Sequence, residues 1–407
     1  MMHINRRHFL ASAAAAPMFS VRWARAAVPV ETALVVVFLR GGMDALSVLA
    51  PADDRHYHAA RPQALRVDVT GDNKGIPVGT AQGTGDLLLS PHMKELGRLW
   101  SDKRLTFIPA SGLRHATRSH FQAMDYMERG LNADRASAPR DGWLTRASLA
   151  LGKTEPGGIV CMGGALPQSL SLCEDALPMS DIWDIDWLPS QAFHEALFEL
   201  HDGDSALDKA SRAAIEATGR LSLKLERNTD KQPVLRDPPR GINYAGWEFG
   251  NKLHFLAEML RVAPDISIAT VDLDGWDTHD NQPDRMPQLL QTLSQNLSAF
   301  DRHVQSNGRP VTVVVMSEFG RRVKANESRG TDHGHGGLMM VLGDRVNGGR
   351  NFGTWPGLAT EQLDEGADLA VTTDYRNVLA TVLHNDAAVA AAFPGYAAKK
   401  IGGLLRA

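Results

Sequence analysis

Cysteine is scarce in this chain and long hydrophobic runs are missing, and both shortages limit what the protein can be. The 407 residues include two cysteines, Cys161 and Cys173. In an oxidising compartment the two could pair, and two free buried thiols are the alternative. The apolar segment from Leu10 to Phe19 is shorter than the roughly 20 residues that a membrane-spanning helix needs. No low-complexity block indicates disorder, and no internal repeat is found.

Basic residues show no excess. The chain has 43 Lys and Arg against 47 Asp and Glu, a formal net charge of −4. No basic patch with interleaved aromatic residues occurs, so nucleic acid is not an expected partner. With 43% hydrophobic and 22% charged residues, the composition is that of an ordinary globular protein. The length admits one large α/β domain or two domains.

The first 26 residues have the pattern of an export signal. A twin-arginine pair, Arg6-Arg7, precedes the apolar segment, and Ala24-Arg25-Ala26 is a small-x-small cleavage site. We expect residues 1–26 to be a twin-arginine signal peptide that engages the twin-arginine translocase, and the mature protein to be periplasmic or secreted. No cysteine follows the apolar segment, so a stable membrane anchor is not expected. Cleavage would remove four arginines and no acids, which changes the net charge from −4 to −8.

Four short apolar runs, each followed by a polar loop that contains glycine, predict the fold. They begin at Leu34, Leu105, Ile266 and Val311. They alternate with segments of helical periodicity, which is typical of a largely parallel sheet covered by helices on both faces. We therefore expect residues 27–407 to form a single three-layer α/β/α domain with a less regular insertion around residues 140–240.

The polar residues that follow the apolar runs are the candidate site. The carboxyl ends of parallel strands lie along one edge of a sheet. We expect the following residues to gather there: Asp44, Ser119, His120, Asp277, His279, Glu318, Asp332, His333 and His335. Carboxylates and imidazoles without thiolates suit zinc, manganese or iron better than calcium or magnesium. Such a metal lowers the pKa of bound water and stabilises an oxyanion or a phosphoryl or sulfuryl group.

Several of these residues have ordinary structural alternatives. Ser119 or Thr117 is the candidate covalent nucleophile. Ser119 and His120 lie near a predicted helix N-terminus, where an anion is favoured, but serine is also a common N-cap and His120 could be an ordinary surface residue. His333 and His335 lie on one side of the chain only if their segment is extended. A loop rich in Asp, His and Gly is also common on protein surfaces.

Five phrases of the mature chain resemble a known bacterial family. They are FLRGGMDALSVLAP from Phe38, RSHFQAMDYMERG from Arg118, DGWDTHDNQ from Asp274, VVMSEFGR from Val314 and GTDHGHGGLMMVLG from Gly330. They resemble the twin-arginine-exported family named domain of unknown function 1501, which is distantly similar to the alkaline phosphatase and sulfatase superfamily. The resemblance implies an alkaline-phosphatase-like α/β/α fold, a metal centre and a Ser, Thr or modified-Cys nucleophile.

The resemblance also implies roles for individual residues. Asp44 matches the ligand after the first strand, and Asp277 and His279 resemble the Asp and His of one metal. Glu318 takes the place of the Asp in the superfamily's Asp-His-Gly motif, and His333 or His335 resembles the last His ligand. Phe319 stands where that motif has a metal-binding His, which leaves a second metal one imidazole short, with His120 or Asp332 as substitute ligands. No Cys-x-Pro/Ala-x-Arg signature is present, so a formylglycine nucleophile is not expected.

The sequence thus predicts an exported metal-dependent hydrolase of a sulfate or phosphate ester. Its substrate would be a small-molecule or polysaccharide ester, and its cofactor a divalent metal, zinc first, with manganese, iron or calcium as alternatives. The expected ligands are Asp44, Asp277, His279, Glu318, Asp332, His333 and His335, and the expected catalytic residues are Ser119 and His120. The alternative is a non-catalytic periplasmic binding or assembly protein on the same fold, in which Trp183 and Trp187 would stack against sugars.

Overall fold

The computed structural model describes residues 32–51, 53–133, 138–186, 191–246 and 248–406. The twin-arginine pair, the cleavage site and Trp187 lie outside these residues, so the export signal stays a prediction. Contacts between Cα atoms group Glu31–Ala407 into one compact unit.

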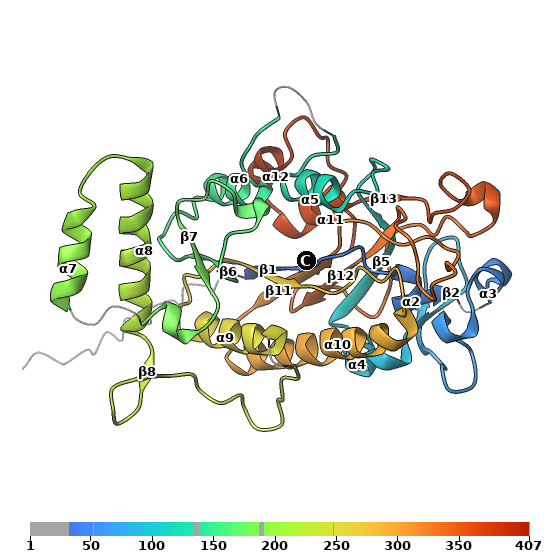
Figure 1. Ribbon diagram of the computed structural model, residues 1–407, viewed down its shortest axis with the longest axis horizontal. Coiled ribbons are helices and arrows are strands. Elements are labelled where there is room, and N and C mark those ends of the chain that lie inside the picture. The colour runs from blue at the N-terminus through green and yellow to red at the C-terminus, as the bar shows by residue number, and fades with distance from the viewer. Residues whose placement is uncertain (1–31, 52, 134–137, 187–190, 247, 407) are drawn as a thin grey trace, which may run out of the picture. The chain divides into compact units, whose positions relative to one another are not determined.

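An eight-stranded sheet of order β13-β5-β12-β11-β1-β10-β6-β7 lies at the centre (Figure 1). Its strands are β1 (Ala33–Leu39), β5 (Leu105–Gly112), β6 (Ile159–Met162), β7 (Ala176–Met179), β10 (Ile268–Leu273), β11 (Val311–Met316), β12 (Gly337–Gly343) and β13 (Thr373–Asp374). Strand β12 is antiparallel to both of its neighbours, and the other pairings are parallel. The largely parallel sheet is therefore confirmed, and β12 begins at the edge where its neighbours end.

Helices cover both faces of this sheet (Figure 1). One layer contains α4 (Lys94–Ser101), α9 (Glu248–Val262) and α10 (Gln282–Ser306), and the other contains α5 (His120–Glu128), α6 (Trp143–Ala150), α11 (Tyr375–Leu383) and α12 (Asp386–Ala392). Alternating side chains of β1 face the two layers: Val35 and Val37 pack in the core with α4, α9 and α10. Val36 and Phe38 pack in the core with α5, α6, α11 and α12. The three-layer α/β/α class is therefore confirmed.

Smaller elements complete the described chain. The sheet β2-β4-β3 follows β1 in sequence, and a two-stranded sheet pairs β8 with β9. Their bounds and those of the remaining helices are α2 (Ala45–Val48), β2 (Leu49–Pro51), α3 (Arg55–Ala60), β3 (Ile76–Thr80), β4 (Asp86–Leu89), α7 (Gln191–Leu200), α8 (Ala206–Ser222), β8 (Glu226–Arg227) and β9 (Pro233–Val234). The single-turn 3-10 helices are η1 (Gln63–Leu65), η2 (Pro91–Met93), η3 (Gln168–Leu170), η4 (Ile182–Asp184) and η5 (Thr360–Gln362).

The two cysteines are buried and unpaired. The sequence left open a disulfide or two free buried thiols, and the structure shows two free thiols. Burial raises the pKa of Cys161 to about 11, so this thiol stays protonated at neutral pH. Among the helices of the described ranges, none combines the length and the apolar character needed to cross a bilayer.

Candidate metal centre

The loops that follow β1, β10 and β11 meet at one edge of the sheet, where β12 also begins. The loop between β11 and β12 folds back on itself, because Arg321 and His333 form an isolated antiparallel bridge. The N–H of Gly320 donates to the carbonyl of His335 over 3.0 Å. Helix α5, the first helix after β5, begins with His120 at the same edge. Residues more than 200 positions apart are thus neighbours here.

Four side chains, which we call the His–Asp cluster, converge at this edge: His120, Asp277, His279 and His333. The Oδ1 atom of Asp277 lies 3.1 Å from Nε2 of His279, 3.3 Å from Nε2 of His333 and 3.5 Å from Nε2 of His120. Donor atoms of His120, Asp277 and His333 all lie within 4.8 Å of one another. A group of two imidazoles and one carboxylate at this spacing can hold a metal ion.

Each imidazole of the cluster is oriented by an oxygen acceptor at its other nitrogen. The Nδ1 atoms lie 2.7 Å from Oε1 of Glu318 for His120, 3.1 Å from Oδ1 of Asp332 for His279, and 2.8 Å from the carbonyl of Arg118 for His333. An Nδ1–H that donates to these oxygens leaves the Nε2 lone pair pointing into the cluster. This is the arrangement in which histidine binds metals.

The carboxylates around the cluster carry negative charge. Burial opposes ionisation of Asp277, but the hydrogen bond and charge of Arg321 outweigh it and lower the pKa to about 2. For Glu318, hydrogen bonds from His120 and from backbone N–H groups outweigh burial and lower the pKa. A hydrogen bond from Asn326 is the main cause of the lowered pKa of Asp332. These three carboxylates outnumber the two guanidinium groups, Arg321 and Arg322, that act on them, so negative charge is left to attract a cation.

Two observations on the imidazoles fit a metal ion. Nε2 of His120 is buried and has no hydrogen-bond partner within the described part of the chain. Nε2 of His279 and Nε2 of His333 lie 2.8 Å apart, so two lone pairs would face each other unless a proton or a cation lies between them. Burial lowers the pKa of His333, which favours its neutral form, whereas the hydrogen bond to Glu318 raises the pKa of His120.

Arg321 joins three loops behind the cluster, a role that no sequence pattern indicated. Its side chain is fully buried. It donates to the carbonyls of Gly41 (2.5 Å), Gly42 (2.7 Å), Trp276 (3.2 Å) and Thr331 (2.8 Å) and to Oδ1 of Asp277 (2.6 Å). Gly41 has φ +119°, and a Cβ there would lie 2.5 Å from the backbone N of Asp277, so this approach requires glycine. The phrase VVMSEFGR contains Arg321, but sequence alone does not place a guanidinium beside an expected metal ligand.

Asp44 is not part of the cluster, which corrects its expected role as a ligand. Its two oxygens form a bidentate pair with Arg61 at 2.5 Å and 2.9 Å. Oδ2 also accepts hydrogen bonds from Ser47 and Gln282, each at 2.6 Å. Because the protein's own donors surround this buried carboxylate, it contributes to the packing of the edge rather than to a metal site.

His335 also lies apart from the cluster. Its Nδ1 is 2.5 Å from Oδ2 of Asp364, and its Nε2 is 2.7 Å from the carbonyl of Leu113. Because an oxygen atom of the protein faces each nitrogen, neither nitrogen is open to a metal ion. Of the two histidines that competed for one ligand role, His333 is therefore the one in the cluster.

Other expected ligands support the cluster from outside. Glu318 and Asp332 were expected to bind the metal, but they accept hydrogen bonds from His120 and His279 instead. Glu318 is fully buried and also accepts the N–H of Gly41 at 2.8 Å. Phe319 is buried, and its ring centroid lies 4.8 Å from that of His120 and 4.9 Å from that of His333. It forms an apolar wall beside two of the imidazoles.

Ser119 occupies a helix N-cap. Its exposed hydroxyl accepts the N–H of Gln122 at 3.5 Å at the start of α5, which is the structural alternative that the sequence allowed. Thr117, the other candidate nucleophile, donates to Oε1 of Gln122 at 2.6 Å. The described hydrogen bonds place no imidazole against either hydroxyl.

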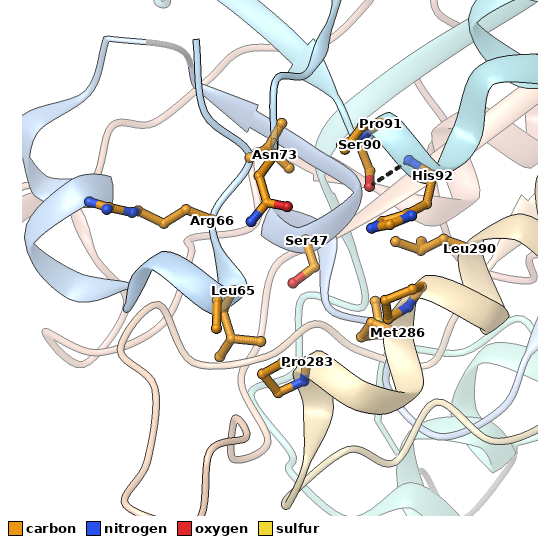
Figure 2. Close-up of a pocket in the computed structure, with 13 residues that line it drawn as sticks. Ser47, Leu65, Arg66, Asn73, Ser90, Pro91, His92, Pro283, Met286 and Leu290 are labelled. Carbon is orange, nitrogen blue, oxygen red and sulfur yellow. Dashed lines mark hydrogen bonds between the residues drawn. The ribbon is translucent and has the colours of Figure 1, made fainter. Parts of the chain in front are cut away.

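A small hollow lies beside η1, η2 and the first turns of α10 (Figure 2). Its volume is about 40 Å³, and Ser47, His92 and Met286 are among the residues that line it. Ser47 is also the residue that donates to Asp44. The space is sufficient for a few water molecules, and it adjoins the Asp44 pair rather than the His–Asp cluster.

Comparison with known proteins gives one family. A family model described as "Protein of unknown function (DUF1501)" matches residues 190–394, which is half of the chain. No curated protein matches the chain.

Among solved structures, the alkaline phosphatase from the Antarctic bacterium TAB5 is 12% identical over 79% of this chain and 95% of that chain, with a TM-score of 0.28. A mutant of the TAB5 enzyme with Mg bound in its M3 site has a TM-score of 0.30 at 12% identity, over 79% of this chain and 94% of that chain. BT1596, a 2-O GAG sulfatase, is 9% identical over 78% of this chain and 65% of that chain, with a TM-score of 0.29. Structural similarities with such low identities and TM-scores do not assign a function to this chain.

Proposed function

This chain belongs to the DUF1501 family of proteins of unknown function, and we propose that it is an exported, metal-dependent hydrolase of a phosphate or sulfate ester. One observation carries the proposal. Imidazole Nε2 atoms from the start of α5 and from two separate loops converge on one carboxylate oxygen, and an oxygen acceptor fixes the Nδ1 of each ring. A cluster with this hydrogen-bonded outer layer is typical of metal sites.

In this proposal His120, Asp277 and His333 bind the metal. They form a three-residue group whose donor atoms all lie within 4.8 Å of one another, and catalytic zinc sites commonly have three protein ligands and one open position. Zinc is the first choice for a set of imidazoles and a carboxylate, followed by manganese and iron. Bound in this set, the ion would polarise the ester and lower the pKa of a water molecule in the open position.

His279 is the proposed acid–base residue. It lies outside that three-residue group, its side chain is 45% exposed, and its Nδ1 is oriented by Asp332. A neutral imidazole held by a carboxylate can accept the proton of an attacking water and return it to the leaving group. Ser119 is not given the nucleophile's role, because its hydroxyl caps α5.

The test combines metal analysis with kinetics. We expect protein purified after native export to contain about one metal ion per chain, and to hydrolyse p-nitrophenyl phosphate or p-nitrophenyl sulfate. The variant His279→Ala should keep its metal and lose most of kcat together with one limb of the pH–rate profile. A metal-free protein that remains inactive on both esters after addition of zinc, manganese, iron or calcium would contradict the proposal.

The non-catalytic alternative also has an observation in its favour. Trp183 is 54% exposed, as expected for a protein that binds sugars or a partner. If the alternative is right, the purified protein binds a carbohydrate or a partner in a Trp183-dependent way and hydrolyses neither ester at any metal loading.

A further inference from the structure

An exposed tryptophan borders a second, larger hollow on the same edge of the sheet. Trp183 lies in η4, and 54% of its surface is exposed. The hollow beside it has a volume of about 370 Å³, and Gly163, Gly164, Ser180 and Asp184 contribute to its lining. Its lining shares no residue with the His–Asp cluster.

The chain holds the backbone of Trp183 in one conformation. Asp181 accepts the N–H of Trp183 at 2.8 Å, and Asp184 accepts the N–H of Asp181 at 3.2 Å, which completes a capping box. Ile182 and Ile185, on either side of the turn, are buried. The indole is therefore presented outward by an ordered segment, which lowers the entropic cost of binding a ligand.

The remaining lining of the hollow combines apolar residues (Leu177, Pro178 and Ala214) with small or polar ones. Gly163 and Gly164 follow β6 directly, and a Cβ at Gly164 would meet no atom within 4 Å. Ser180, directly after β7, and Asp184 are exposed. A flat aromatic face beside hydroxyl and carboxylate groups suits a sugar ring, which has apolar C–H faces and a polar rim.

The hollow and the His–Asp cluster share one edge of the sheet. Strands β6 and β7 lie next to β10 and are parallel to it. Neighbouring strands are about 4.8 Å apart, so the end of β7 lies roughly 10 Å along the edge from the end of β10. The loop that begins with Gly163 also contains η3, which packs against α5, the helix that carries His120. A ligand of several linked units can reach from one site to the other.

We propose that this hollow is a carbohydrate-binding subsite and that the substrate is an ester carried on an oligosaccharide or polysaccharide. The assignment of the substrate class rests on the proposed function, whereas the subsite itself does not. In this arrangement Trp183 stacks against one sugar ring while a neighbouring unit presents its ester to the His–Asp cluster.

Calorimetric titration of the exported protein with dextran sulfate and with heparin tests the subsite independently of activity. We expect Trp183→Ala to weaken binding of at least one of the two polymers by about tenfold, since a single aromatic platform is removed. Trp183→Phe should retain most of the affinity. Phe193→Ala, which removes another exposed aromatic ring (43% exposed), is the matched control and should bind as the wild type does.

The outcomes separate the two proposals. The subsite is overturned if neither polymer binds the wild type, or if both bind Trp183→Ala as tightly as the wild type. It is also overturned if poly(vinyl sulfate), which carries the charge without sugar rings, binds equally well and with the same dependence on Trp183. Binding that depends on Trp183, in a protein that hydrolyses no phosphate or sulfate ester, supports the subsite and overturns the proposed function.

Discussion

Two aspartates that follow buried strands of the same sheet have opposite surroundings. Asp44, after β1, has a side chain that is 1% exposed, and it forms a bidentate pair with Arg61. Asp277, after β10, is 50% exposed and faces three imidazole Nε2 atoms. Both carboxyl groups have a lowered pKa, so the two residues do not differ in ionisation. They differ in solvent access, because Arg61 and its neighbours enclose Asp44, whereas Asp277 is open to solvent.

The comparison shows what makes a carboxylate at a strand end available to a metal. A buried arginine contacts each of the two aspartates, Arg61 for Asp44 and Arg321 for Asp277. Arg61 contacts both oxygens of its partner, but Arg321 contacts Oδ1 and distributes its other hydrogen bonds over four backbone carbonyls. Arg321 thus positions Asp277 without enclosing it.

The largest effect is expected from breaking the Asp44 pair. Asp44→Leu leaves Arg61 buried without its counter-ion and should lower the free energy of unfolding by about 3–5 kcal/mol. The double variant Asp44→Leu/Arg61→Met should recover much of this loss, because neither charge then remains buried alone. Denaturant unfolding of both variants is the measurement. A double variant as unstable as the single one would show that the pair is not the cause.

Removing an imidazole from the cluster should affect metal binding instead. His333→Ala is expected to weaken metal affinity by roughly a hundredfold or more, since even outer hydrogen-bond partners of ligands contribute 10–100-fold. Competition with a metal chelator measures this. His335→Gln, two residues away, is the matched control: it should lower thermal stability through its lost contact with Asp364 and keep the wild-type metal content. Equal metal loss in both variants would contradict the assignment of His333.

A smaller loss is expected when the partner of a cluster histidine is changed. Asp332→Asn retains the shape of the side chain but removes the charge that orients His279. If His279 is the acid–base residue, kcat should fall by about tenfold or more while metal content stays unchanged. The pH–rate profile should change as well, because Asp332 no longer orients the His279 imidazole. A fall in metal content with an unchanged profile would make His279 a ligand.

The smallest effect is a pH dependence specific to Asp44. Burial raises the pKa of this group, but attraction by Arg61 and hydrogen bonds from Arg61, Ser47 and Gln282 outweigh it, so the folded-state pKa is lowered. Its stabilising contribution is therefore fully present above the unfolded-state pKa of about 3.9 and is lost as the pH falls through the lower folded-state pKa. Unfolding free energies measured from neutral to acidic pH should show this loss in the wild type and a flatter profile in Asp44→Asn.

The sequence predicted the layers and the edge of the sheet because these depend on local patterns. The apolar runs at Leu34, Leu105, Ile266 and Val311 correspond to β1, β5, β10 and β11, which all run in one direction. The direction of β12 was not predicted, because an apolar run looks the same in either orientation.

Which of the polar residues join the His–Asp cluster and which pair elsewhere could not be predicted, because contacts with residues far away in the sequence decide it. Asp44 is enclosed by Gln282, 238 residues away, and His335 is bound by the carbonyl of Leu113, 222 residues away. His333 and His335 lie two residues apart in one Gly-rich loop and face different partners. The sequence pattern identifies these residue types and the sheet edge that they share. It does not show which oxygen atom each histidine nitrogen will contact.

The hydrogen bonds of Arg321 have a consequence for the order of folding. They join Gly41 to a side chain 280 residues later, and His120 meets Glu318 across 198 residues. Contacts between such distant segments form late, after the intervening chain has been arranged. Metal uptake during refolding should therefore follow the recovery of secondary structure. Metal binding would then indicate that the whole sheet has formed.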